Sequence, residues 1–216
     1  MKKTKYFAEH SIASTSKTMF GQLGNQFDLH QDKLLPPKAA LLILDMQEFF
    51  HNKNSHAFVP SADAIIVPIN SVVQKFSEYN RPIIITRHLN TNDNAKQMNY
   101  WWRDTITENG GFSQLISEFD IPQTNLIVKS QYDAFYNTNL DDILQKNNVE
   151  QVLITGVMTH LCCETTARSA FVHGYNVFFP IDGTATYNEQ FHLATLTNLA
   201  HGFANITLID KLIKEF

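Results

Sequence analysis

The sequence predicts a Rossmann-like α/β fold of three layers, in which helices cover both faces of an open, mostly parallel sheet of six strands. Six short apolar runs are nearly continuous rather than alternating, which is typical of strands that are covered on both faces. Between these runs, apolar residues recur three and four positions apart, which indicates helices packed on the sheet. Strands and helices therefore alternate along one domain.

Composition excludes several other classes of protein. The 216 residues are 44% hydrophobic and 18% charged, which indicates a globular chain rather than a disordered one. Seventeen basic and 21 acidic residues give a net charge of −4, so we expect no nucleic-acid partner. No apolar run approaches the roughly 20 residues of a membrane helix, and no signal-peptide core follows Met1. We therefore expect a cytoplasmic protein with no membrane partner.

Residues 1–36 differ from the rest of the chain because they are polar and only weakly periodic. They carry scattered aromatic residues, among them Phe7, Phe20 and Phe27. We interpret this segment as an N-terminal arm, too polar to be part of the core, that precedes a single domain at 37–216. Such an arm could wrap around a neighbouring subunit.

The remaining elements follow in order along the chain. The predicted strands are Ala39–Leu44, Ile83–Thr86, Asn125–Val128, Gln151–Thr155, Asn176–Ile181 and Asn205–Leu208. Helices are expected at Ile65–Phe76, Asn139–Lys146, Cys163–Phe171 and Glu189–His201. Pro68 requires that the first helix either begins near it or is kinked there. The polar stretch Asn90–Gly111 is predicted to be a long excursion that shapes a site.

Three residues with reactive side chains come directly after predicted strands. Asp45 follows the first strand, Lys129 the third, and Cys162 lies at the turn between the fourth strand and its helix. Because ligands of such sheets bind at the carboxyl ends of the strands, we expect these side chains to converge. Each also has a purely structural interpretation, as a turn residue, a solvated charge or a packed thiol, so position alone leaves the function open.

Helical spacing separates the two neighbouring cysteines. Cys163 begins the apolar stripe that faces the sheet, whereas Cys162 is rotated about 100° away from it in the first helical turn. The helix N-terminus and Lys129 are expected to lower the pKa of the Cys162 thiol and to make it a nucleophile. Asp45 would accept the thiol proton and pass it to a leaving group, provided that burial raises its pKa.

Four motifs resemble the isochorismatase-like hydrolase superfamily, which includes nicotinamidases, N-carbamoylsarcosine amidohydrolases and isochorismatases. They are "LDMQEFF", "VKSQYDAF", "ITGVMTHLCCETTARSAF" and "DGTATY", and the resemblance runs from about Ala39 to Leu208. It implies the isochorismatase-like hydrolase fold and a catalytic triad of Asp45, Lys129 and Cys162. It also implies an acyl-enzyme intermediate and a cis peptide bond between Val157 and Met158. Backbone amides at Val157, Met158 and Cys162 would form the oxyanion hole.

The chain departs from the family in two ways. Nicotinamidases carry a metal-binding Asp-x-His after the second strand, where this chain has "RHLN", so we expect no metal and no other cofactor. The arm, the excursion and the residues around the cysteines resemble true isochorismatases more closely than nicotinamidases. True isochorismatases cleave a vinyl ether and need no thiol, so Cys162 favours amide hydrolysis while its surroundings favour isochorismate.

Further residues are candidates for substrate binding because of their positions. Arg87 could pair with a substrate carboxylate, with a surface salt bridge as the alternative. His160 lies too close to Cys162 along a tight turn to form a Cys–His pair, so we expect a capping or supporting role. The remaining candidates for the pocket wall, for which core packing is the alternative, are Gln47, Phe50, Trp101, Trp102, Tyr132 and Phe135.

The function predicted from the sequence is hydrolysis of a small amide or a related carbon–nitrogen bond through Cys162, Asp45 and Lys129. A true isochorismatase that releases pyruvate by acid catalysis from Asp45 is the alternative, and a noncatalytic binding or scaffold domain is a second one. A small-molecule substrate is the expected partner. The resemblance also implies a homodimer or homotetramer.

Overall fold

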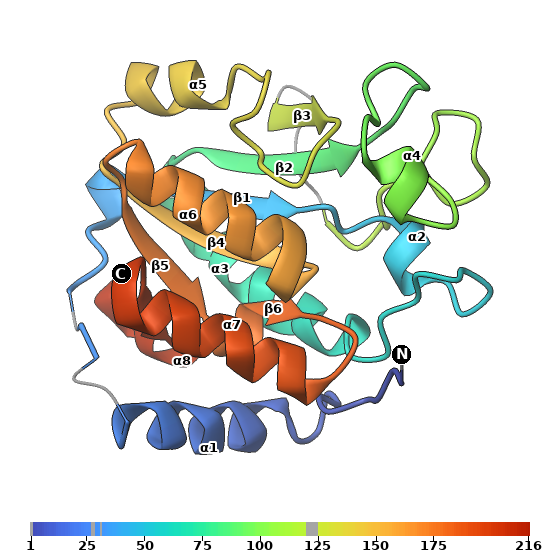
Figure 1. Ribbon diagram of the computed structural model, residues 1–216. Helices are drawn as coiled ribbons and strands as arrows, with labels where there is room; N and C mark the ends of the chain where they lie inside the picture. The colour runs from blue at the N-terminus through green and yellow to red at the C-terminus, as the bar shows by residue number, and fades with distance from the viewer. Residues whose placement is uncertain (1, 27–28, 31, 120–124) are drawn as a thin grey trace.

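The computed structural model describes residues 2–26, 29–30, 32–119 and 125–216 and contains one parallel sheet (Figure 1). Its strands lie in the order β3-β2-β1-β4-β5-β7, and the short β6 pairs with the end of β4. The strand bounds are β1 Ala39–Leu44, β2 Ile83–His88, β3 Leu126–Lys129, β4 Gln151–Val157, β5 Asn176–Pro180, β6 Thr184–Ala185 and β7 Asn205–Thr207. The predicted class of fold is confirmed, and β6 is the one strand that the sequence pattern did not indicate among these residues.

Helices cover both faces of the sheet. α6 lies in front of the strands and α3 behind them in Figure 1, which gives the three layers that the periodicity predicts. The helix bounds are α1 Ile12–Gly24, α2 Glu48–His51, α3 Ile66–Glu78, α4 Met98–Trp101, α5 Leu140–Lys146, α6 Glu164–Val172, α7 Glu189–Gly202 and α8 Ile209–Leu212. No helix in the described part of the chain is both long and apolar enough to span a membrane.

The position of Pro68 is explained by where α3 begins. A 3-10 turn at Asp63–Ile65 leads into α3, which starts at Ile66. Pro68 therefore lies in the first turn, where a backbone N–H has no partner within the helix and proline is tolerated. Of the two alternatives, the helix beginning near the proline is correct.

The N-terminal segment contributes to the core, so the expectation that it is too polar to do so is wrong. Phe7 is fully buried, and α1 buries Ile12, Met19 and Leu23 at a spacing that places them on one helix face. α1 packs against α7 of the same chain. The predicted boundary at residue 36 stays a prediction, and Phe27 lies outside the described residues.

The excursion after β2 lies at the carboxyl end of the sheet. Figure 1 shows α2, α4 and the loops around them beyond the tips of β1 and β2. The side chain of Gln47 fixes this region, because its amide nitrogen donates to the carbonyls of His88 and Ser113 and its oxygen accepts from the His88 N–H. The predicted excursion thus forms one wall above the strand ends.

Candidate active site

Three strands bring the predicted catalytic side chains together. Asp45 follows β1, Lys129 ends β3, and Cys162 lies in a π-helical turn, Thr159–Cys163, that connects β4 to α6. Their exposed fractions are 0%, 2% and 4%, so all three are withdrawn from water. The convergence expected from the strand ends is present.

A short ion pair is at the centre of the cluster. Lys129 Nζ lies 2.7 Å from Asp45 Oδ2, and the Thr86 hydroxyl donates a hydrogen bond of 2.6 Å to the other carboxylate oxygen. The same ammonium donates to the Gln131 carbonyl at 2.9 Å and lies 3.4 Å from the Cys162 sulfur. Asp45 itself has a positive φ of 52°, a left-handed conformation that Asp tolerates better than most residues. The carboxylate is thereby held by partners on two neighbouring strands.

The electrostatics of the cluster differ from the expectation in two respects. Burial raises the pKa of the Cys162 thiol, and the attraction of Lys129 does not outweigh burial and the charge of Asp45. Burial also opposes ionisation of Asp45, but Lys129 and His88 hold its pKa below the usual range. The expectation of a lowered thiol pKa is wrong, and the condition set for Asp45, a pKa raised by burial, is not met. At neutral pH the site holds a carboxylate, an ammonium and a protonated thiol.

The chain turns sharply below the thiol. The peptide bond between Val157 and Met158 is cis, as the resemblance implies. The Met158 carbonyl accepts from the N–H groups of Leu161 and Cys163 at 3.0 and 3.2 Å, which fixes the turn that carries Cys162. The role of the amides of Val157, Met158 and Cys162 as oxyanion donors stays a prediction.

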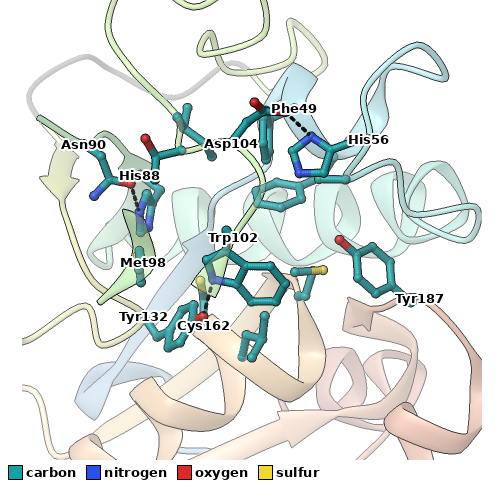
Figure 2. A pocket seen from close by; sticks show the side chains of 16 residues that line it. Phe49, His56, His88, Asn90, Met98, Trp102, Asp104, Tyr132, Cys162 and Tyr187 are labelled. Atoms are coloured by element: carbon teal, nitrogen blue, oxygen red, sulfur yellow. Dashed lines mark hydrogen bonds and ion pairs between the residues drawn. The ribbon is translucent and has the colours of Figure 1, made fainter. Parts of the chain in front are cut away.

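A small cavity of about 60 Å³ lies above Cys162 (Figure 2). Most of its wall is aromatic or apolar. The lining residues are Phe49, Phe50, His56, Ala57, His88, Asn90, Met98, Trp102, Asp104, Thr105, Ile106, Tyr132, Met158, Leu161, Cys162 and Tyr187. Among these described lining residues there is no Lys or Arg. The cavity is therefore suited to an uncharged, flat ligand.

Three of the candidate substrate-binding residues line this cavity. Phe50, Trp102 and Tyr132 are part of its wall, and the Trp102 indole N–H donates to the Tyr132 hydroxyl at 2.6 Å. This hydrogen bond connects the excursion after β2 to the loop after β3. It fixes the orientation of two aromatic rings beside the thiol, as Figure 2 shows.

Two further candidates serve the wall without lining the cavity. Gln47 is buried and binds the backbone of the excursion. Arg87 donates to Glu108 at 3.2 Å and to the Ser113 carbonyl at 2.9 Å, so the salt-bridge alternative is present. Its contact with a substrate carboxylate stays a prediction.

The last three candidates also lie outside the cavity wall. Trp101 is 72% exposed on α4, and Phe135 is buried against His173, with ring centroids 4.7 Å apart. His160 shares a hydrogen bond of 2.6 Å with the Thr186 hydroxyl and stacks on Phe191. Within the described part of the chain, His160 forms no hydrogen bond with Cys162, and its capping or supporting role stays a prediction.

Several lining residues were missed by sequence reasoning. His88 lies two residues after the predicted strand Ile83–Thr86, and Tyr187 ends the "DGTATY" motif, so both had a positional signal. Met98 and Asp104 lie in the predicted excursion, but no signal singled them out individually, and His56 carried none, because long-range folding of the loops brings these residues to the cavity. His56 Nδ1 lies 3.1 Å from Asp104 Oδ2 at the rim.

The parallel sheet and the buried cluster of Asp45, Lys129 and Cys162 are consistent with the site of a cysteine hydrolase. A model of the isochorismatase domain matches residues 39–211, and the chain belongs to this family of hydrolases. It is 38% identical over 179 residues to nicotinamidase 3 of Arabidopsis thaliana, which covers 81% of this chain and 86% of that protein. It is 26% identical over 199 residues to enterobactin synthase component B of Escherichia coli, with 88% and 69% covered.

Solved structures show the same fold. A cysteine hydrolase from Pseudomonas syringae superposes with a TM-score of 0.79 at 24% identity, over 88% of this chain and 97% of that one. A pyrazinamidase of Pyrococcus horikoshii, solved in complex with zinc, gives a TM-score of 0.72 at 26% identity, over 80% and 99%.

The zinc in that relative makes it necessary to ask whether a metal fits this chain. Ligand atoms of Asp45, His88 and Cys162 lie within 4.8 Å of one another, which is close enough to hold an ion. The ammonium of Lys129, however, already lies 2.7, 3.3 and 3.4 Å from these three groups. A divalent cation in their midst would meet this positive charge at short range. The donor set therefore does not fit a metal ion.

Proposed function

We propose that the protein hydrolyses a small, neutral aromatic carboxamide through an acyl-enzyme intermediate on Cys162. The observation that carries this proposal is a thiol beside a buried Asp45–Lys129 pair, at an aromatic cavity whose described wall has no basic side chain. The identity with nicotinamidase 3 supports a pyridine carboxamide as the first substrate to test.

In the first step, the Cys162 sulfur attacks the amide carbon while its proton passes to the Asp45 carboxylate. The negative charge thus passes from Asp45 through the sulfur to the amide oxygen, which becomes the oxyanion of the tetrahedral intermediate. Lys129 Nζ lies 2.7 Å from the Asp45 carboxylate and 3.4 Å from the sulfur, so it stabilises the charge as the thiol ionises. Because the net charge of the buried cluster does not change, proton transfer avoids the cost of creating an additional charge away from water.

In the second step, protonated Asp45 delivers its proton to the nitrogen of the tetrahedral intermediate, the carbon–nitrogen bond breaks, and ammonia leaves. Water then attacks the thioester carbon and gives a proton to Asp45. The carbon–sulfur bond breaks, the sulfur regains the proton from Asp45, and the carboxylic acid is released. The carboxylate product is anionic and meets Asp104 at the cavity rim, which favours its departure.

The competing function, cleavage of isochorismate, requires a site for two carboxylates. Bidentate arginine is the usual partner for a carboxylate, and the one arginine expected for this role, Arg87, is bound to Glu108 and Ser113 instead. The described cavity wall offers no replacement. The structure therefore favours the neutral amide over the dianionic vinyl ether.

Two assays run side by side test the proposal. We expect the wild type to release ammonia from nicotinamide, Cys162→Ala to lose at least about 1000-fold in kcat, and neither protein to release pyruvate from isochorismate. Pyruvate release that survives in Cys162→Ala would contradict the proposal and establish the vinyl-ether reaction. Stoichiometric binding of a protein partner without turnover of either compound would favour a noncatalytic domain.

A further inference from the structure

The ammonium of Lys129 has more acceptors around it than it has protons to donate. Its three N–H groups face Asp45 Oδ2 at 2.7 Å, the Gln131 carbonyl at 2.9 Å, His88 Nδ1 at 3.3 Å and the Cys162 sulfur at 3.4 Å. The two short contacts are the ion pair with the carboxylate and the hydrogen bond to the carbonyl. Because three N–H groups face four partners, the two longer contacts, to His88 and Cys162, compete for a proton.

The protonation of His88 follows from its neighbours. An ammonium can only donate, so His88 Nδ1 is the acceptor and carries no proton. Burial and the charge of Lys129 lower the pKa of His88 to about 4, so the ring is neutral and its proton lies on Nε2. This Nε2–H donates to Asn90 Oδ1 at 2.9 Å, and the Asn90 amide donates to the Ser130 carbonyl at the same distance. Every hydrogen bond in this series, from the Lys129 ammonium to the Ser130 carbonyl, therefore has a fixed direction.

We propose that His88 is a positioning residue that takes the third proton of the Lys129 ammonium in the resting site and yields it to the Cys162 sulfur as the thiol ionises. A hydrogen bond to an anion is stronger than one to a neutral acceptor. The Cys162 thiolate therefore accepts the shared N–H of Lys129 in preference to His88, whereas the neutral thiol does not. His88 thus adds to burial and to the charge of Asp45 in favouring the protonated thiol in the resting site. The inference rests on Cys162 being the nucleophile of the proposed function.

The charged and titratable groups around Cys162 come from every strand end at the site. They are Asp45 after β1, His88 at the end of β2, Lys129 at the end of β3, Tyr132 beyond it, and Cys163 on the same turn. Within this set, His88 is the group that competes with the Cys162 sulfur for a proton of the Lys129 ammonium. A change confined to His88 should therefore alter the ionisation of Cys162 while the ion pair between Asp45 and Lys129 stays in place.

Two substitutions separate this role from simple packing. His88→Leu fills a similar volume but removes the acceptor, whereas His88→Asn retains an oxygen near the position of Nδ1. The measurement is the rate of alkylation of Cys162 by iodoacetamide against pH, followed on the Cys162 peptide by mass spectrometry. We expect His88→Leu to react about tenfold faster at a given pH, which is a shift of the curve by about one unit to lower pH. His88→Asn should follow the wild type.

Identical curves for all three proteins, or the same shift in both variants, would overturn the inference. If His88→Leu does not fold, nitrogen-15 spectra of the wild-type histidines test the inference instead, and a proton on Nδ1 of His88 at neutral pH would refute it. A stoichiometric metal ion in the purified protein would also refute the inference. Alkylation needs no substrate, so failure here is distinct from a failure to hydrolyse amides.

Discussion

Asp45 and Lys129 depend on each other because each carries its charge at a position without access to water. Their side chains are 0% exposed, and their charged atoms lie 2.7 Å apart. Leaving one member of such a pair alone in the interior is much more costly than replacing both. The pair therefore couples the chemistry of the site to the stability of the fold.

A double-mutant cycle measures this coupling. We expect Asp45→Asn and Lys129→Met to lower the free energy of unfolding by about 3–5 kcal/mol each, and the double variant to lose less than the sum of the two. Urea unfolding followed by circular dichroism gives the three differences. Additive losses would show that the two charges do not stabilise each other.

The pH dependence of this pair has a defined sign. Burial opposes the charge of Asp45, but the ammonium of Lys129 favours it and holds the pKa of Asp45 below its ordinary value of 3.8. The stabilisation that the Asp45 charge contributes is therefore present above pH 3.8 and is lost as the pH falls through the folded-state pKa. Burial also opposes the charge of Lys129, but the Asp45 carboxylate favours it and raises the pKa of Lys129 above 10.5. The stabilisation that the Lys129 charge contributes is lost only as the pH rises through this folded-state pKa. We expect the difference in unfolding free energy between the wild type and the double variant to be constant between these two limits. A difference that changes across pH 6–8 would contradict the assignment.

At the scale of an element, the end of β4 must lie unusually close to β1. Gly156 has a φ of 108°, and a Cβ there would lie 2.1 Å from the Leu44 carbonyl oxygen and 2.6 Å from the Leu44 nitrogen. The carboxyl ends of the two strands carry Asp45 and the turn with Cys162. The glycine thus permits the approach of the strand ends that builds the site.

Substitution of this glycine should be costly. We expect Gly156→Ala to lower the free energy of unfolding by about 3 kcal/mol or more, because both the backbone conformation and the contact become unfavourable. Gly174→Ala is the matched control, since its φ of 92° is also positive but nothing lies within 4 Å of the added carbon. Equal losses in thermal unfolding of the two variants would show that the approach to Leu44 is not limiting.

The N-terminal segment is a second element with a functional position. Lys3 Nζ lies 4.2 Å from the centre of the Tyr187 ring and donates to the His56 carbonyl, and both of these residues line the cavity. The Thr4 N–H donates to the Tyr187 carbonyl at 2.8 Å. The segment therefore holds two sides of the cavity wall together from behind.

We expect Lys3→Met to raise the KM for the amide about three- to tenfold, with little change in kcat, because the wall loosens while the catalytic cluster is untouched. Steady-state assays of ammonia release check this. Lys2→Met is the control, since Lys2 is exposed and its carbonyl, rather than its side chain, accepts a hydrogen bond from Asn188. The idea fails should both variants have the KM of the wild type.

For the whole molecule, the sequence predicts the sheet and the catalytic cluster better than it predicts the cavity. Strands buried on both faces leave a local apolar signal, and Asp45, Lys129 and Cys162 could be found because each follows such a strand. The cavity wall depends on contacts between distant segments, such as Lys3 with His56. The direction of the thiol pKa also depends on burial, which no local pattern reveals.

The assembly of the molecule stays a prediction from the family resemblance. α1 packs on its own chain rather than extending from it, so the segment that was expected to wrap a neighbour is already engaged. Tyr100 and Trp101 on α4 are large exposed aromatic residues beside the cavity wall. A homodimer or homotetramer would be recognised by light scattering as a multiple of the mass of the chain.

The central claim is that Cys162 forms a covalent bond to the acyl group of an amide. Mass spectrometry of the protein quenched in acid during turnover of nicotinamide tests it directly. We predict a mass increase of one acyl group on the peptide that carries Cys162, and none in Cys162→Ala. Ammonia release at an undiminished rate by Cys162→Ala, with no adduct on the wild type, would contradict the account.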